Sequence, residues 1–349
     1  MLRPLTAVVV LFLGCGRTQL VDYAADGGEF DDWAVRKEDG GVACIDGRLA
    51  LLPARPVVML VLDRSSSMNQ SFPGTGTSKW TALRGALHQA LPPWGGSLEL
   101  GTLIFPSLQS AACTVGSTAD IEPALDNVSA VLAKLDSTSP SGSTPTAVAL
   151  QRAGAAISSR RTAGSAKALV LATDGAPDCN TGLDPRTCVC VGGNGPCTAV
   201  RCLDDARSLD QLTTLAAAGI PTWIVGLRGS NDSLFVDVLN RMADAGGRPQ
   251  VGGAQRFYSA SSQLELETAF RTIREQVGRC RYLTPSVPDV GGTIELHLDG
   301  SFLPYDPTHT GGWTWVDTGN GELELNGDAC TRSESLPLEA LEVVVKCAP

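Results

Sequence analysis

Three short polar motifs in this chain carry oxygen donors that suit a divalent cation. The first motif, Asp63-x-Ser65-x-Ser67, places one carboxylate and two hydroxyls within a single turn. Thr144 lies in a second polar stretch, and Asp174 lies in a third. Carboxylate and hydroxyl oxygens are hard ligands, the kind that Mg²⁺ prefers in a near-octahedral arrangement. These residues therefore predict cation binding, with other loops or water completing the coordination shell.

The hydrophobic pattern predicts elements that bring the three motifs together. Residues 57–62 and 167–172 are continuous apolar runs, which are typical of strands buried on both faces of a parallel sheet. The first motif follows the first run, Asp174 follows the second, and Thr144 precedes a predicted helix at residues 145–157. Ligands of such sheets bind at the carboxyl ends of the strands. We therefore expect the three loops to converge at one edge of the sheet.

The rest of residues 56–278 alternates between predicted strands and helices. Further strands are expected at residues 98–105, 220–226 and 256–258, and further helices at residues 79–91, 121–135, 208–218, 234–245 and 262–277. Such alternation is typical of a parallel sheet that is covered by helices on both faces. The expected fold class is α/β, with a central, mostly parallel sheet flanked by helices.

Residues 279–349 follow a different pattern, which predicts a small β module. Its expected strands include residues 293–298, 323–325 and 341–345, separated by turns that contain Gly. We expect no helix of useful length here. Trp313 and Trp315 would lie on the same side of a strand, either as a packing pair, which we favour, or as an aromatic patch that binds, for instance, sugar.

In this order along the chain, the three motifs resemble the metal-ion-dependent adhesion site of the von Willebrand factor type A domain. The resemblance covers roughly residues 56–278 and implies a Rossmann-like fold that binds Mg²⁺ or Mn²⁺. The metal ligands that it implies are the hydroxyls of Ser65, Ser67 and Thr144, with Asp63 and Asp174 acting directly or through water.

The register of the second loop stays open. Thr146 competes with Thr144 as the ligand, because it too lies at the start of the predicted helix. Ser143 stands where the family often has Gly, and this departure leaves both threonines as candidates.

A site of this kind explains binding rather than catalysis. A cation that faces few carboxylates keeps residual positive charge, and an Asp or Glu of a protein partner can fill its open position. The chain offers only His88, His297 and His309 as imidazole bases, and no Gly-x-Ser-x-Gly elbow accompanies Ser65. We therefore expect a protein-binding module and not an enzyme. The main alternative is a metal-independent structural scaffold of the cell envelope, and a hydrolase is a weaker one.

Composition narrows the choice of partners. The chain has 349 residues with 27 Lys and Arg against 37 Asp and Glu, which gives a net charge of −10. A nucleic-acid binder needs the opposite charge, and anionic membrane surfaces are disfavoured for the same reason. The 43% content of hydrophobic residues is sufficient for a full core.

The N-terminus resembles an export signal. Arg3 precedes an apolar run at residues 5–13, which is shorter than the roughly 20 residues needed to span a bilayer. The run ends in Phe12-Leu13-Gly14-Cys15, which resembles a bacterial lipobox, although Phe12 stands where Leu is usual. The resemblance implies that residues 1–14 are a signal peptide and that Cys15 is lipidated. Ordinary secretory cleavage, with Cys15 in a disulfide, is the alternative.

The layout as a whole resembles von Willebrand factor type A lipoproteins of myxobacteria. Residues 15–55 contain an acidic, Gly-containing stretch and predict a flexible tether. The expected location is the cell envelope, at the outer membrane or cell surface, or otherwise periplasmic or secreted. The lipid anchor would be the only membrane contact.

Eleven cysteines indicate an oxidising compartment. Ten remain if Cys15 is lipidated, an even number. An insertion at residues 175–205 contains Cys179, Cys188, Cys190, Cys197 and Cys202; Cys113 is the candidate sixth member, and the other even group is Cys44, Cys280, Cys330 and Cys347. The insertion has no paired C-x-x-C spacing, so we favour disulfides over a zinc site. The hypothesis is that this cross-linked loop shapes the choice of partner beside the metal.

Overall fold

The computed structural model describes residues 34, 35, 37, 39–107, 112–158, 166–191, 196–228 and 233–349. The chain forms two compact units. The larger unit is Pro53–Arg281, and the smaller unit combines Tyr282–Pro349 with the described residues up to Leu52. The predicted signal peptide, Cys15 and most of the predicted tether lie outside the described residues.

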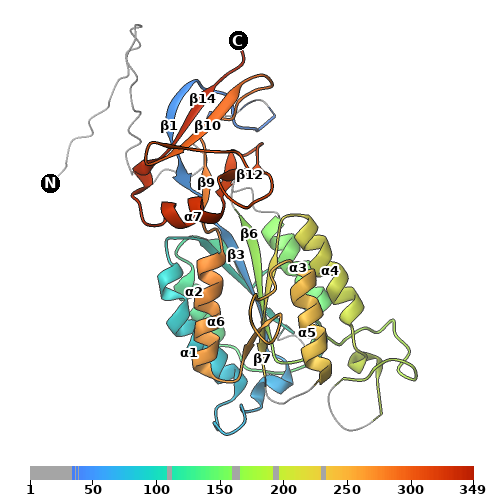
Figure 1. Ribbon diagram of the computed structural model, residues 1–349. Coiled ribbons are helices and arrows are strands. Elements are labelled where there is room, and N and C mark those ends of the chain that lie inside the picture. Colours follow the sequence, from blue (N-terminus) through green and yellow to red (C-terminus); the bar gives the residue numbers. More distant parts are fainter. Residues whose placement is uncertain are drawn as a thin grey trace, which may run out of the picture. The chain divides into compact units, whose positions relative to one another are not determined.

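The larger unit is built on one six-stranded sheet of order β5-β4-β3-β6-β7-β8 (Figure 1). Its strands are β3 (Val57–Asp63), β4 (Glu99–Phe105), β5 (Ile121–Ala124), β6 (Lys167–Thr173), β7 (Thr222–Leu227) and β8 (Tyr258–Ala260). All neighbours pair in parallel except β5, which is antiparallel to β4. The expected α/β class with a mostly parallel sheet is therefore confirmed.

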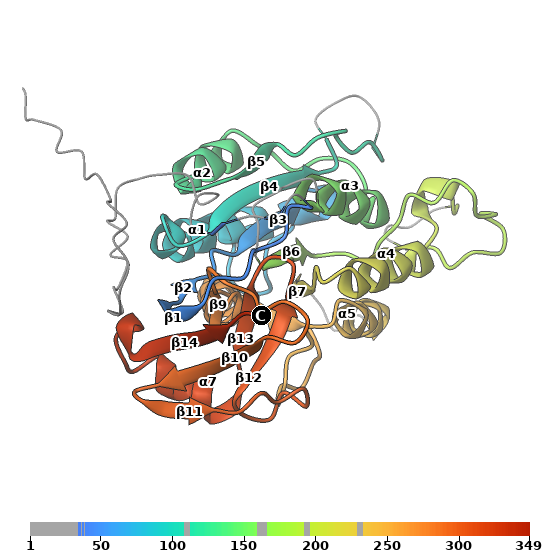
Figure 2. The same cartoon turned by 90° about the horizontal axis from the view of Figure 1, so that it is seen from above.

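Helices cover both faces of this sheet, as the view in Figure 2 shows for most of them. One face packs against α1 (Lys79–Ala90), α2 (Val128–Asp136) and α6 (Gln263–Gln276). The other face packs against α3 (Thr146–Ser158), α4 (Asp205–Ala217) and α5 (Ser233–Ala245). These helices lie close to the ranges that the hydrophobic periodicity predicts, apart from α2.

The position of β3 between two layers of helices explains why residues 57–62 are all apolar. Val58, Leu60 and Leu62 point into the core beneath α1 and α6. Val57, Met59 and Val61 point into the core beneath α3 and α5. Successive side chains of a strand face opposite sides of the sheet, so a strand with helices on both faces needs apolar residues at every position.

The helix expected at residues 121–135 is wrong in its first part, where the chain forms edge strand β5. The strand runs so close to β4 that a Cβ on Gly101 would lie 2.9 Å from the carbonyl oxygen of Ile121. Asn127 follows the strand, and its side-chain amide donates to Leu100 O at 2.9 Å and to Glu122 O at 2.7 Å. The helical spacing of the apolar residues gives no indication of this pairing, because the pairing depends on a distant strand.

Most residues of two further four-stranded sheets, of order β1-β14-β10-β11 and β12-β13-β9-β2, belong to the smaller unit. Their strands are β1 (Gly47–Ala50), β2 (Leu52–Pro53), β9 (Arg281–Leu283), β10 (Thr293–Leu298), β11 (Ser301–Leu303), β12 (Trp313–Asp317), β13 (Glu322–Leu325) and β14 (Leu341–Lys346). The unit also contains a short helix, α7 (Gly327–Ser333). This helix is not predicted by the sequence pattern, because the Asn-Gly pair at its start is typical of a turn.

The last part of the segment expected to be a tether, residues 15–55, is folded. Strand β1 pairs with β14 in antiparallel register, with Gly47 opposite Val345. A disulfide between Cys44 and Cys347 fixes the same two chain segments. Strand β1 is not predicted by the sequence pattern, because a four-residue edge strand gives almost no periodic pattern of apolar residues.

The two tryptophans of β12 pack together. Trp313 is 2% exposed, and its ring lies edge-on to Trp315 with centroids 5.2 Å apart. The ring of Tyr305 also packs edge-on against the ring of Trp313, with centroids 5.1 Å apart. The packing pair, rather than a fully exposed aromatic patch, is therefore the arrangement in the folded unit.

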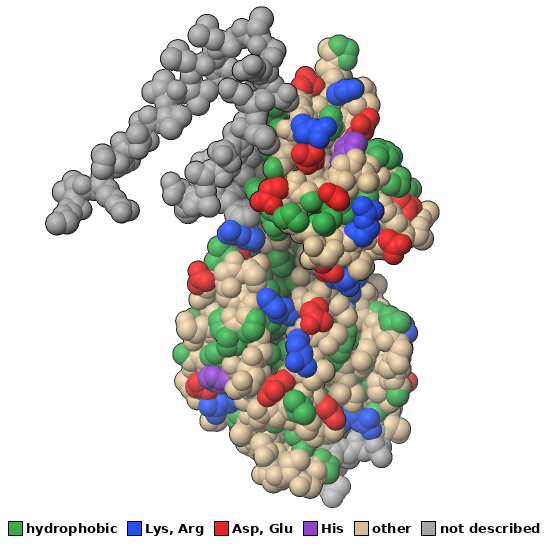
Figure 3. Space-filling model, turned by 60° about the vertical axis from the view of Figure 1, so that its left-hand side comes forward, with side chains coloured by type: hydrophobic (Ala, Val, Ile, Leu, Met, Phe, Trp, Pro, Cys, Tyr) green, Lys and Arg blue, Asp and Glu red, His purple; other side chains and the backbone are tan. Residues whose placement is uncertain are grey.

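The surface of the larger unit mixes both signs of charge. On the face seen in Figure 3, basic and acidic side chains are interspersed over this unit. Surface residues of this unit also form ion pairs, such as Arg84 with Asp136 at 2.6 Å. Within the described parts of the chain, none of the helices has the length and apolar character needed to cross a membrane.

The buried sheet makes a direct prediction for stability. Leu169 in β6 is fully buried, so Leu169→Ala should lower the free energy of unfolding by about 2–5 kcal/mol in denaturant titrations. Leu264 on α6 is 70% exposed, so the control Leu264→Ala should change it by less than about 0.5 kcal/mol. Equal losses for the two variants would contradict the assigned core.

Candidate metal centre

The first two motif loops are joined by backbone hydrogen bonds. The amide of Ser66 donates to Gly142 O at 2.9 Å, and the amide of Ser141 donates to Arg64 O at 2.7 Å. The loop after β3 and the loop before α3 therefore lie side by side, as expected from their places along the chain.

Arg64 clamps these loops to a third segment. Its guanidinium donates to Pro106 O at 2.6 Å, to Ser107 O at 3.1 Å and to Ser139 O. Arg64 is only 4% exposed, and five fixed donors allow one guanidinium to satisfy several buried carbonyls. It occupies a variable position of the first motif, so the motif alone gave no signal for this role.

The hydroxyls of the first motif meet the carboxylate of the third. Ser65 Oγ and Ser67 Oγ are 3.0 Å apart, and Ser67 Oγ donates to Asp174 Oδ1 at 2.7 Å. Asp63 lies behind them and is fully buried. It accepts from the amide of Ser65 at 2.7 Å and from Thr173 Oγ1 at 2.6 Å. Asp63 thus ties the carboxyl ends of β3 and β6 together.

Thr144 reaches the same place from the second loop. An added Cβ on Gly175 would lie 3.6 Å from Thr144 Oγ1 and 4.0 Å from Ser67 Oγ, so both hydroxyls flank this glycine. Asp178 Oδ1 accepts from the amide of Thr144 at 2.6 Å, which fixes the loop. Thr146, by contrast, is 1% exposed and directs its hydroxyl to Thr144 O at 3.4 Å. The geometry favours Thr144 over Thr146.

An open cavity of about 720 Å³ lies over these groups. Ser65, Ser67, Thr144 and Asp174 line it, whereas Asp63 does not. On another side, its described lining includes Cys190, Val191 and Arg201 of the insertion. The cysteine-rich segment therefore forms part of the wall of the same cavity.

Lys79 is a component of the site that the sequence patterns did not reveal. Its Nζ lies 2.6 Å from Asp174 Oδ2, and the two side chains are 5% and 0% exposed. Lys79 is the first residue of α1, where Ser78 caps the helix by accepting from the amide of Thr81. A lysine at the start of a predicted helix normally lies in solvent, so nothing in the local sequence indicated a buried ion pair.

The comparisons with known proteins agree with this geometry. The family model described as the von Willebrand factor type A domain matches residues 58–176, which contain all three motif loops. Residues 58–176 therefore contain the motif-bearing part of a von Willebrand factor type A domain. No curated protein matches the chain in sequence.

Several solved structures resemble the chain weakly. The pilus adhesin SpaC from Lactobacillus rhamnosus GG is 15% identical with a TM-score of 0.48, over 85% of this chain and 39% of the adhesin. The PilB minor pilin from Streptococcus sanguinis is 18% identical with a TM-score of 0.45, over 70% of this chain and 66% of the pilin. The SpRpn10 VWA domain is 11% identical with a TM-score of 0.40, over 62% of this chain and 94% of that domain. At these levels the likeness carries no information on function.

The donor set of the type A domain fits a hard divalent cation. Three hydroxyls and one carboxylate from three loops surround one part of the cavity, with a second carboxylate behind them. Burial and, after it, the nearby charge of Asp174 together raise the pKa of Asp63 from 3.8 to about 7. A cation between these groups would offset that repulsion.

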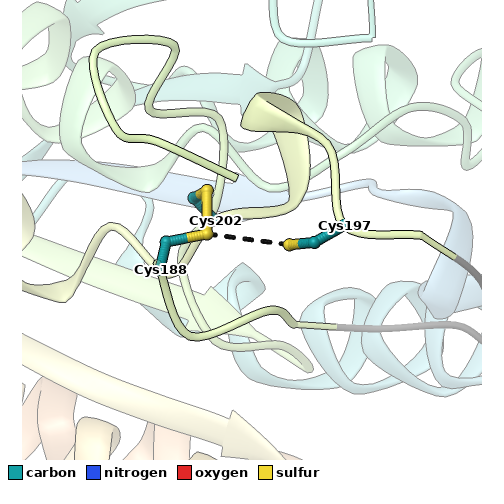
Figure 4. Close-up of side chains that lie close together, drawn as sticks. All are labelled: Cys188, Cys197 and Cys202. Atoms are coloured by element: carbon teal, nitrogen blue, oxygen red, sulfur yellow. Dashed lines mark hydrogen bonds between the residues drawn. A yellow bond between two sulfur atoms is a disulfide. The ribbon is translucent and has the colours of Figure 1, made fainter. Parts of the chain in front are cut away.

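The insertion of the type A domain is cross-linked by disulfides, as expected. Cys113 pairs with Cys179, Cys188 with Cys202, and Cys190 with Cys197. Cys188 Sγ also lies 3.6 Å from Cys197 Sγ, so three sulfurs gather in one place (Figure 4). Each of the three belongs to a disulfide, which argues against the zinc alternative. All ten cysteines after Cys15 are disulfide-bonded.

The burial of Asp63 predicts a pH dependence of stability in the presence of a chelator. Its folded-state pKa of about 7 exceeds the ordinary value of 3.8, so the folded protein holds a proton that the unfolded chain releases. Stability should therefore fall as pH rises through this window, by at most about 1.4 kcal/mol per pH unit from this group.

Denaturant titrations at several pH values test this. Asp63→Asn should remove that part of the slope. The control Asp136→Asn should keep it, because Asp136 is a surface carboxylate whose pKa is lowered by its hydrogen bonds to Arg84 and His88. An unchanged slope in Asp63→Asn would contradict the assignment.

Proposed function

We propose that this protein is an exported binding module that engages an acidic side chain of a protein partner through Mg²⁺ or Mn²⁺. The observation that carries the proposal is the meeting of Ser65, Ser67, Thr144 and Asp174 at the wall of one open cavity. A bound cation would supply a Lewis acid with a position left for a carboxylate oxygen of the partner.

Each residue has a distinct part in this proposal. The hydroxyls of Ser65, Ser67 and Thr144 are neutral donors, which leave positive charge on the cation. Asp174 is the carboxylate that lines the cavity. Asp63 lies outside the lining and already accepts two hydrogen bonds, so it would act through water or by holding Ser65 in place.

The described lining of the cavity supports binding rather than catalysis, because it contains no histidine. His88 lies on α1 beside Asp136, at 3.1 Å. His297 and His309 belong to the smaller unit. We therefore propose that the protein has no enzymatic activity of its own.

Ten disulfide-bonded cysteines support an oxidising location outside the cytoplasm. We further propose lipidation at Cys15 and a place in the cell envelope, on the strength of the lipobox resemblance. The partner would then be another envelope or extracellular protein with an exposed Asp or Glu. A nucleic acid is excluded from the proposal by the net charge of −10.

One observation favours the alternative of a metal-independent scaffold. The ion pair between Lys79 and Asp174 neutralises the cavity carboxylate from within the chain. If this pair persists under all conditions, the type A domain would need no cation and would serve as a framework. Calorimetric titration with MnCl₂ and capture of a partner separate the two functions.

Calorimetric titration with MnCl₂ tests the metal site with a matched pair of variants. Thr144→Val removes the hydroxyl at the cavity and should weaken Mn²⁺ binding at least tenfold. Thr146→Val alters a neighbouring buried hydroxyl and should leave the affinity within about twofold. Capture of a partner from envelope extract should require Mg²⁺, fail with EDTA and fail with Thr144→Val. Metal binding that is equal in both variants would contradict the assigned ligand.

The insertion makes a separate prediction for partner choice. Replacing Cys190 and Cys197 by Ser removes a cross-link in the cavity wall, so affinity for the captured partner should fall at least fivefold. Mn²⁺ affinity should stay the same, because no proposed ligand lies in the insertion. Unchanged partner affinity would show that this wall has no part in recognition.

A further inference from the structure

We propose that Lys79 is a built-in competitor of the divalent cation for Asp174, so that loading the cavity with metal requires displacement of an ammonium group. This inference rests on the proposed function, because it concerns regulation of the same site. It adds a residue that no motif of the site contains.

Both carboxylate oxygens of Asp174 already accept hydrogen bonds from this chain. Asp174 Oδ1 accepts from Ser67 Oγ at 2.7 Å, and Oδ2 accepts from Lys79 Nζ at 2.6 Å. Each carboxylate oxygen therefore has a donor of this chain beside it without any cation. Each oxygen keeps a second lone pair, so a metal that binds Oδ2 would lie beside the ammonium of Lys79.

The charges of the site set the cation against Lys79. Asp63 and Asp174 contribute two negative charges when both are ionised. Lys79 contributes one positive charge, with its Nζ 2.6 Å from Asp174 Oδ2. A divalent cation at the same carboxylate would repel the ammonium, because like charges at close range in a buried site are weakly screened. The lysine thus lowers the affinity for metal, and the metal lowers the stability of the ion pair.

The position of Lys79 leaves room for its displacement. Lys79 lines the cavity, although its side chain is only 5% exposed. Its flexible side chain lets the displaced ammonium move into the open volume. There it would add positive charge beside the cation, which favours an acidic partner. Metal loading and partner binding would then support each other, while Asp174 of the unloaded site stays neutralised by Lys79.

Calorimetric titration of the full chain with MnCl₂ at constant ionic strength tests this. Lys79→Met should bind Mn²⁺ at least tenfold more tightly than the natural protein. The control Lys134→Met removes another ion-paired lysine of the same unit, 2.8 Å from Asp120, and should leave the affinity unchanged. Mn²⁺ binding by Lys79→Met alone also supports competition by the lysine, and it overturns metal dependence of the natural protein.

The contrary outcomes are distinguishable. Equal Mn²⁺ affinity in the natural protein and Lys79→Met overturns the role of Lys79 but leaves the proposed function standing. Absence of Mn²⁺ binding in both overturns both proposals.

A second variant and a melting measurement guard against loss of folding. Lys79→Gln keeps a hydrogen-bond donor for Asp174 without the charge, and it should bind Mn²⁺ several-fold more tightly than the natural protein. Both Lys79 variants should melt at lower temperature in EDTA and gain more from Mn²⁺ than the natural protein does. A lysine with a purely structural role would lower the melting temperature without any larger gain from Mn²⁺, and that result would overturn the proposal.

Discussion

The burial of two carboxylates at one edge of a sheet is the constraint on which the functional part of this protein depends. Asp63 is fully buried, and the side chain of Asp174 has no exposed surface. Isolated buried charges are strongly unfavourable, so each must be paired, hydrogen-bonded or neutralised. Here Thr173, the amide of Ser65, Ser67 and Lys79 share this task. The polar edge is stable only because its loops are held in register.

The fold provides that register. The parallel strands β3 and β6 end side by side, which brings their following loops to one edge. Backbone hydrogen bonds and the guanidinium of Arg64 fasten the loop before α3 to the loop after β3. A disulfide between Cys113 and Cys179 then anchors the insertion near its start. The cation proposed here would enter a site whose oxygen donors are already positioned by hydrogen bonds.

Much of this arrangement was accessible from the sequence. The apolar run before Asp63 predicts a strand buried on both faces, and the order of the three polar motifs predicts their meeting at the strand ends. The cysteine count after Cys15 is even and so allows full pairing, and the choice of disulfides over zinc is confirmed. These inferences rest on local pattern and on the geometry common to parallel sheets.

Long-range pairing set the limit of the sequence analysis. The buried state of Lys79 depends on a partner 95 residues away, and β1 depends on β14 and on a disulfide with a sequence separation of 303. The sequence of β5 predicts a helix, because the pairing of β5 with β4 produces no recognisable pattern of apolar residues. In each case, the energy that decides the local structure comes from residues that the local pattern does not contain.

The central claim is that a divalent cation binds among the hydroxyls of three loops. The most direct test is anomalous diffraction at the manganese edge from crystals of the full chain grown with MnCl₂. The account predicts a manganese peak within coordination distance of Ser65, Ser67 and Thr144, with Lys79 moved away from Asp174. A structure at saturating Mn²⁺ with no peak there, and with Lys79 still paired to Asp174, would contradict it.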